Sequence, residues 1–220
     1  MITHSSPTLP IEAPMSSVQA APLDADALLQ ASRRVDWRFL LPDPNLGRVA
    51  FLGPARGPLI ESLRLFSAAL AANDAASQDG LYDIVVAVDP EHAVLRRAAG
   101  LLRPGGHLYV EARGPFKPTR LLRGGRPRFA AGYVAAVRRL GLVEAVAHWH
   151  WPNFESCAEI VPLGERDALL LALARRRGGA GARLKSALGR ALLWSGMFAR
   201  LAPCFSVVAR KSEQLSLRGQ

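Results

Sequence analysis

The stretch VAFLGPARGPL (residues 49–59) joins a short apolar segment to a glycine-containing turn and then to a proline. The run Arg48–Leu52 is apolar and partly β-branched, which predicts a buried strand. Gly53 and Gly57 lie in the turn, and Pro58 is suited to the first helical position, where its missing N–H needs no partner. The stretch therefore predicts a strand, a turn and a helix in succession, as in nucleotide-binding α/β folds.

Further along, strand-like and helix-like segments continue to alternate. The clearest strand is Tyr82–Asp89 (YDIVVAVD), a continuous apolar run typical of parallel strands that are covered on both faces. Asp89 is then suited to cap the next helix, with Pro90 at its first position. Other expected strands are residues 107–114, 142–152 and 204–211, and other expected helices are residues 24–34, 129–142, 165–177 and 182–202. This alternation predicts the α/β class, with a Rossmann-like, doubly wound, mostly parallel sheet between two helix layers.

Length and composition favour one domain. The chain has 220 residues, half of them hydrophobic, which is enough for one substantial core. We expect a flexible leader at residues 1–23, a single domain at residues 24–211 and a tail at residues 212–220. Cys157 and Cys204 lie far apart in the sequence and form neither a disulfide framework nor a metal-ligand pair, which favours a reducing cytoplasm.

The net charge of +10 raises the expectation of an acidic partner, although an Arg-rich composition alone is a weak signal. Residues 113–128 hold six Arg or Lys and no acid. This segment is expected to be a surface loop, either a lid for an acidic or phosphorylated substrate or simply a solvated segment. The helix at residues 182–202 is apolar with basic residues. Its uninterrupted apolar run is much too short to cross a bilayer, which needs about 20 residues. The helix could lie on a membrane surface, but a helix covering the sheet is favoured.

Several segments, in this order, resemble the class I S-adenosylmethionine-dependent methyltransferases. They are VAFLGPARG, the acid Asp74, YDIVVAVD, AAGLLRPGGHLYVEARG, GLVEAVAHWHW and FSVVARK, which together span residues 48–211. The resemblance implies a sheet of six to seven strands with an antiparallel last strand. It also implies S-adenosyl-L-methionine as the cofactor and methyl transfer as the reaction.

The sequence departs from the family pattern in two places. Phe51 stands where the family usually has an acid, and Ala55 stands where it has the middle of three alternating glycines. Arg56 adds a guanidinium beside a turn that would face a sulfonium cation. Tyr82 follows Asp74 by only eight positions, where the family normally inserts a helix and a third strand. We therefore expect a shortened sheet.

The cofactor-binding residues implied by the resemblance are Gly53, Ala55, Gly57 and Asp74. Asp74 lies about 21 residues after Gly53, close to the spacing of roughly 20 at which dinucleotide-type folds present a carboxylate to a ribose. A solvated loop acid is the simpler alternative for Asp74, and a plain strand-to-helix connection is the alternative for the turn.

The predicted catalytic residues follow the strand at residues 82–89. A base there could remove a proton from an acceptor hydroxyl, and His92 is favoured over Asp89 because an imidazole titrates near neutrality. The alternative for Asp89 is an ordinary helix cap.

The predicted substrate-binding residues are Glu111, Arg113 and His150. Glu111 lies near the end of its strand and could be a pocket acid. His148 and His150 share one face of their strand and the two neighbouring tryptophans share the other. No third ligand is evident, so no metal is expected. We expect the tryptophans in the core and one histidine at the pocket rim.

Three functions are compatible with these features. A methyltransferase acting on a small molecule, with oxygen as the favoured acceptor atom, is the leading hypothesis. The second is a catalytically inactive module that keeps the fold for interaction or regulation, which the changes at Phe51 and Ala55 suggest. Nucleic-acid methylation is disfavoured because the Asn-Pro-Pro-Tyr type of motif is lacking and aromatic residues are sparse among the basic ones.

Overall fold

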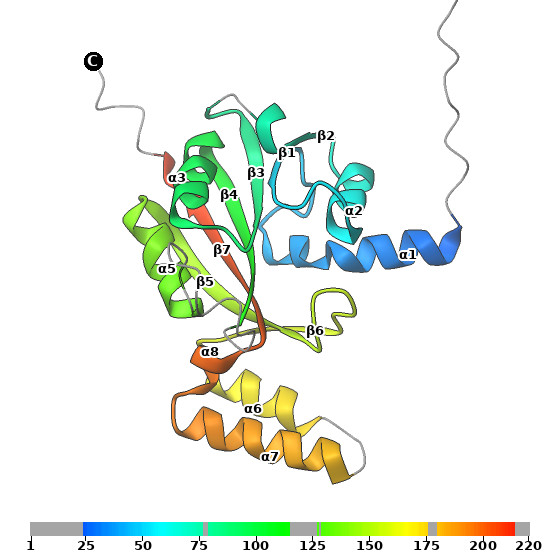
Figure 1. Cartoon of the computed structure of the whole chain (residues 1–220), viewed down its shortest axis with the longest axis vertical. Helices are drawn as coiled ribbons and strands as arrows, with labels where there is room; N and C mark the ends of the chain where they lie inside the picture. Colours follow the sequence, from blue (N-terminus) through cyan, green and yellow to red (C-terminus); the bar gives the residue numbers. More distant parts are fainter. Residues whose placement is uncertain (1–23, 77–78, 115–126, 128, 176–179, 214–220) are drawn as a thin grey trace, which may run out of the picture.

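The architecture is a mixed sheet of seven strands between helices (Figure 1). The computed structural model describes residues 24–76, 79–114, 127, 129–175 and 180–213. The strands are β1 (Arg48–Leu52), β2 (Ala69–Ala72), β3 (Tyr82–Val88), β4 (Leu102–Arg113), β5 (Leu142–Trp151), β6 (Glu159–Pro162) and β7 (Cys204–Lys211). Their order in the sheet is β2-β1-β3-β4-β7-β5-β6.

The strand directions confirm the predicted fold class. Strands β2, β1, β3 and β4 are parallel neighbours. The last strand, β7, runs antiparallel to both β4 and β5, so β5 points the same way as β4. The carboxyl ends of β1, β3, β4 and β5 therefore lie at one edge of the sheet, where ligands of open α/β sheets bind.

The sheet buries both of its faces. Along β3, Val85 and Ala87 pack into one apolar cluster and Ile84 and Val86 into the other. The first cluster includes residues of α3 (His92–Leu101) and α5 (Ala130–Arg139), and the second includes residues of η1 (Asp36–Leu40) and α2 (Pro58–Phe66). Figure 1 shows α3 and α5 on one side of the sheet and α1 (Ala25–Arg34) and α2 on the other.

Several helix boundaries agree with the sequence-based expectation and one does not. Pro58 occupies the start of α2, and Gly141 follows α5 with a φ of 80°, a conformation that favours glycine. The predicted cap at Asp89 is wrong, because α3 begins only at His92, after Glu91. Asp89 has a φ of 47° and continues the ladder beyond β3, donating its N–H to the carbonyl of Glu111 at 2.7 Å.

The expected shortening of the sheet is present in the described residues. After β2 the chain makes only a short helical turn, η2 (Asn73–Ala75), before it enters β3. The strand β6, which the sequence patterns did not predict, extends the sheet beyond β5. In the described residues the sheet therefore has the single strand β2 beyond β1 and the single strand β6 beyond β5.

The expected helix at residues 182–202 is instead two helices, of which the first lies away from the face of the sheet and the second packs Phe198 against Trp149 of β5. They are α7 (Ala180–Trp194) and α8 (Phe198–Leu201), and Gly196, with a φ of 71°, lies between them. Helix α7 packs against α6 (Arg166–Ala174). Figure 1 shows this pair, which we call the α6–α7 hairpin, beyond the carboxyl edge of the sheet. The leader at residues 1–23, most of the basic loop and the glycine-rich residues 178–179 lie outside the described residues.

Candidate functional site

A cavity of about 160 Å³ lies at the carboxyl edge, beside the glycine turn. Its walls come from the turn, the first residues of α2, the ends of β3 and β4, helix α1 and the loop after β5. The lining residues are Arg34, Phe51, Pro54, Arg56, Gly57, Pro58, Leu59, Ile60, Val88, Asp89, Glu111, Arg113, Phe154 and Glu155. The cavity thus occupies the position that the fold class reserves for a ligand.

Gly57 gives this cavity an open backbone surface. Its φ of 136° and ψ of 168° lie in a region accessible almost only to glycine, and a Cβ built there would meet no heavy atom within 4 Å. It immediately precedes α2, whose first turn supplies the N–H groups of Leu59 and Ile60 without intrahelical acceptors. The backbone here can approach a ligand closely and can bind an anionic group of it.

Gly53 and Ala55 have different surroundings. A Cβ at Gly53 would lie 2.8 Å from the ring of Phe51, so the packing of the turn requires glycine at this position. The Gly53 N–H donates to Oδ1 of Asn73 at 3.0 Å, which links β1 to the end of β2. Ala55 is exposed, and neither residue lines the cavity.

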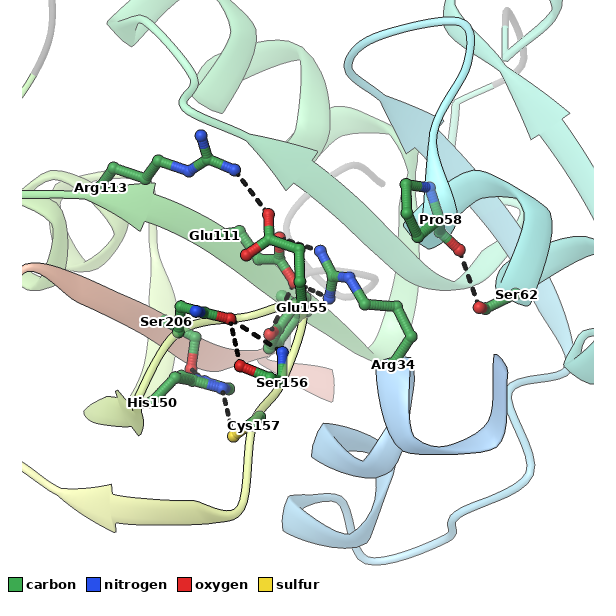
Figure 2. Close-up of polar contacts among 12 residues, drawn as sticks. Arg34, Pro58, Ser62, Glu111, Arg113, His150, Glu155, Ser156, Cys157 and Ser206 are labelled. Atoms are coloured by element: carbon green, nitrogen blue, oxygen red, sulfur yellow. Dashed lines mark hydrogen bonds and ion pairs between the residues drawn. The ribbon is translucent and has the colours of Figure 1, made fainter. Parts of the chain in front are cut away.

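Glu111 is held at the cavity wall by a buried ion pair with Arg34. Two guanidinium nitrogens of Arg34 donate to the two carboxylate oxygens, each at 2.6 Å (Figure 2). The Tyr109 hydroxyl donates to the same carboxylate at 3.1 Å, and the Trp37 ring stacks on the Tyr109 ring at 3.8 Å. Burial and then the charge of Glu111 raise the pKa of Tyr109 well above its usual value, so the phenol stays protonated.

The pairing also sets the charge of Arg34. Burial opposes its charged form, but the hydrogen bonds and the negative charge of Glu111 raise its pKa above the ordinary value. Arg34 is the last residue of α1, so the ion pair fixes the end of this helix against the sheet.

Asp89 and Arg113 lie on the cavity wall as well. Oδ1 of Asp89 accepts the backbone N–H of Arg113 at 3.0 Å, which joins the ends of β3 and β4. The Arg113 guanidinium pairs with Glu155 at 2.7 Å, and both side chains are partly exposed (Figure 2). This pair connects the end of β4 to the loop after β5 and forms a rim of the cavity.

Three other predicted site residues lie away from the cavity. Asp74 is fully exposed, with a carboxylate oxygen 3.6 Å from the Arg97 guanidinium. His92 is exposed at the first position of α3. His150 is buried, with Nε2 at 2.8 Å from the Ser206 hydroxyl, and it does not line the cavity.

The two histidines of β5 are interior groups. Burial lowers the pKa of His148 to about 4. Burial, with smaller effects from His148 and Arg34, lowers the pKa of His150 to about 3. Both imidazoles are therefore neutral at physiological pH, and neither side chain is at the rim where one histidine was expected. Trp149 is buried in the core, as expected.

Four of the nine site residues predicted from the sequence line the cavity, namely Gly57, Asp89, Glu111 and Arg113. It missed Arg34, Phe154 and Glu155. Arg34 was part of a predicted helix, but no local pattern could show that its partner lies 77 positions away. A carboxylate in the middle of an apolar strand, as at Glu111, was the one available sign that a buried cation would be needed nearby.

The described residues contain neither a metal-ligand cluster nor a membrane-spanning helix. No group of three or more His, Cys, Asp or Glu among them could hold a metal ion. No helix in that part of the chain is both long and apolar enough to cross a membrane.

The strand order and the antiparallel β7 form a Rossmann-like α/β fold, as the resemblance to the class I S-adenosylmethionine-dependent methyltransferases implied. No family model and no curated protein sequence matches this chain. Solved structures do match. Phosphoethanolamine N-methyltransferase 2 of Haemonchus contortus, in complex with S-adenosyl-L-methionine, is 15% identical with a TM-score of 0.47, over 86% of this chain and 53% of that one. The chain thus spans about half the length of that enzyme.

Two further structures resemble it over most of their length. An S-adenosylmethionine-dependent methyltransferase of Archaeoglobus fulgidus is 14% identical with a TM-score of 0.46, over 84% of this chain and 93% of that one. The [4+2]-cyclase SpnF is 17% identical with a TM-score of 0.42, over 90% of this chain and 84% of that one. These likenesses concern the fold, and the assignment of function rests on this chain's own residues.

Proposed function

We propose that this protein binds S-adenosylmethionine in the cavity beside the glycine turn and transfers its methyl group to an oxygen of a small-molecule acceptor. The observation that carries the proposal is the backbone at Gly57, which is restricted to glycine and opens into the cavity. Close approach to a ligand is the physical reason for such a position. The residues fit the cofactor there, because the first N–H groups of α2 suit its carboxylate.

The cofactor and the cavity residues would have different roles in the reaction. Bound S-adenosylmethionine would supply the activated methyl group. Asp89 lines the cavity, so we assign to it the removal of the proton from the acceptor hydroxyl as the new carbon–oxygen bond forms. His92, the base favoured from the sequence, is exposed and does not line the cavity, and Asp89 is therefore the better candidate.

The acceptor would enter past the rim formed by Arg113 and Glu155. Arg56 and Arg113 both line this side of the cavity, which favours an acidic or phosphorylated acceptor. Asp74 is exposed and would have to move to contact the ribose of the cofactor, and we propose this ribose contact as its role. The free cysteines Cys157 and Cys204 are consistent with the cytoplasmic location we propose.

The test is isothermal titration of the purified protein with S-adenosylmethionine and S-adenosylhomocysteine, with NAD as a control ligand. We expect micromolar binding of the first two and none of NAD. A Gly57→Leu variant would fill the cavity and should abolish binding. Gly141→Leu is the matched control, because Gly141 also has a positive φ and open space but lies at the end of α5.

A second candidate function, a non-catalytic module, is favoured by one specific observation. The buried Arg34–Glu111 pair and the Phe51 ring occupy the cavity wall, and the remaining 160 Å³ is below the range of about 300–1,000 Å³ usual for small-molecule sites. Absence of binding by well-folded protein would support this candidate. Methyl transfer that is lost in Gly57→Leu and kept in Gly141→Leu would exclude it.

A further inference from the structure

The solvent-facing side of α7 has the wrong composition for a helix that faces water. Seen along the helix, Ala187, Leu188, Ala191, Trp194 and Ser195 fall within an arc of about 120°. All five are exposed, Leu188 to 59% and Trp194 to 72%. The solvent side of a surface helix is normally charged or polar, so this side is suited to contact with something other than water.

The opposite side of α7 already has its partner within the molecule. The Ser186 hydroxyl donates to the Leu173 carbonyl of α6 at 2.6 Å, and a Cβ on Gly189 would lie 2.8 Å from a Leu173 methyl. These contacts hold α7 firmly on α6. Helix α7 therefore packs within the hairpin through its other side, and its exposed apolar side is left without a partner in the described residues.

Basic residues are frequent in this part of the sequence, and two of them lie beside the apolar side. Between Arg166 and Leu201 the sequence holds eight Arg or Lys and a single acid, Asp167. The Arg166 guanidinium lies 4.1 Å from the centre of the Trp194 ring, and Arg190 is an exposed neighbour on α7. Leu171 of α6 is also exposed, to 51%. Apolar and aromatic residues flanked by cations are the pattern of elements that lie in the interface of an anionic bilayer.

An apolar cavity continues this side inward. It has a volume of about 240 Å³, lies between α7, α8 and the end of β5, and includes Leu188 at its wall. All of its lining residues are uncharged: Trp149, Trp151, Leu173, Leu188, Gly189, Leu192, Phe198, Leu201, Ala202 and Pro203. Apolar surface here extends from Leu188 into the molecule, as a surface that contacts lipid chains would need.

We propose that the α6–α7 hairpin is a docking element for an anionic lipid bilayer, with Trp194 and Leu188 inserted at the interface and with Arg166 and Arg190 paired with lipid phosphates. A second copy of the chain is the poorer partner, because two such hairpins would bring like charges together. Because the hairpin extends beyond the carboxyl edge of the sheet, docking would place that edge close to the membrane (Figure 1). The proposal does not depend on methyl transfer.

The first experiment is co-sedimentation of the full chain with vesicles of phosphatidylcholine alone and of equal parts phosphatidylcholine and phosphatidylglycerol. We expect binding to the anionic vesicles that weakens with added salt, and little binding to the neutral ones. The double variant Trp194→Ala and Leu188→Ala should lower the partition coefficient about tenfold or more. The matched control is Phe39→Ala, since Phe39 is an aromatic residue exposed to 64% outside the hairpin, and this variant should bind like the wild type.

The second experiment locates the contact. Vesicles with bromine on their acyl chains should quench tryptophan fluorescence of the wild type, and most of the quenching should vanish in Trp194→Phe, which keeps an aromatic ring but loses this fluorophore. Circular dichroism of each variant checks that it is folded. The proposal is overturned if anionic vesicles are not bound, if Phe39→Ala reduces binding as much as the hairpin variant, or if Trp194→Phe leaves the quenching unchanged.

Discussion

At the scale of single residues, the site is dominated by one buried ion pair. The Arg34 and Glu111 side chains are exposed to only 9% and 4%, and each satisfies the charge of the other. A buried charge without a partner is far more costly than a paired one. The pair therefore couples α1 to β4 in this structure.

Removing either partner should destabilise the fold strongly. We expect Arg34→Met or Glu111→Gln to lower the free energy of unfolding by about 3–5 kcal/mol, since each leaves a buried group unpaired. The double variant should lower the free energy of unfolding by clearly less than the sum of the two single effects, because it leaves neither buried charge without its partner. Urea unfolding of the four proteins measures this coupling. Additive effects would contradict a direct, buried interaction.

The buried histidines predict a loss of stability in acid. The folded-state pKa of His148 is about 4, below its ordinary value of 6.5. Above pH 6.5 the imidazole is neutral in both states and contributes nothing. Between pH 6.5 and 4 the unfolded chain binds a proton that the folded chain refuses, so the free energy of unfolding falls by up to about 1.4 kcal/mol per pH unit.

The variant His148→Leu should flatten this dependence. The Nδ1 atom of His148 is buried without a hydrogen-bond partner in the described structure, so an apolar side chain of similar size should be tolerated at pH 7. Urea unfolding at pH 7, 6 and 5 should show that the variant loses less stability on acidification than the wild type. Equal losses would mean that His148 titrates normally in the folded protein.

At the scale of helices and strands, sequence patterns were sufficient where local chemistry decides the structure. The apolar run of β3, the proline at the start of α2 and the glycine after α5 were all predicted and confirmed. The predicted helix cap at Asp89 was wrong, because the backbone of Asp89 is held by a long-range hydrogen bond to β4. The strand β6 and the two-helix arrangement of residues 180–201 likewise depend on tertiary contacts that no short pattern contains.

The packing of α7 on α6 should depend on the small size of residue 189. We expect Gly189→Leu to lower the free energy of unfolding by about 1–3 kcal/mol, because the added side chain would collide with the buried Leu173. Gly164→Leu is the matched control, since a Cβ at Gly164 meets nothing within 4 Å and no positive φ restricts this position. Thermal unfolding of both variants tests the expectation, and equal destabilisation would mean that the helix contact is not tightly packed.

At the scale of the whole molecule, the candidate site is built from parts that lie far apart in the sequence. Gly57, Asp89 and Glu111 lie at or after the carboxyl ends of β1, β3 and β4, which are neighbours in the sheet, and this half of the site could be predicted from the strand order. The other half consists of Arg34 from α1 and Phe154 from the loop after β5. These two were beyond prediction because nothing in their local sequence shows where their segments dock.

This division predicts which parts of the molecule respond to the cofactor. The cavity of about 160 Å³ is too small for a ligand of ordinary size, so binding requires its walls to move. The walls at Gly57 and Asp89 belong to the sheet edge, which is anchored by the core. The walls at Arg34 and Phe154 come from α1 and from the loop after β5, so opening of the Arg34–Glu111 pair would widen the cavity.

Hydrogen exchange with and without S-adenosylmethionine measures this response. We expect the cofactor to change the exchange of backbone amides at residues 32–41 and 153–157, while those of β3 and of α6 change little. In Arg34→Met the wall at α1 is already released, so the cofactor should bind faster to this variant, provided that it remains folded. Binding accompanied by changes at the α6–α7 hairpin alone would place the cofactor elsewhere and would refute the assignment of this cavity.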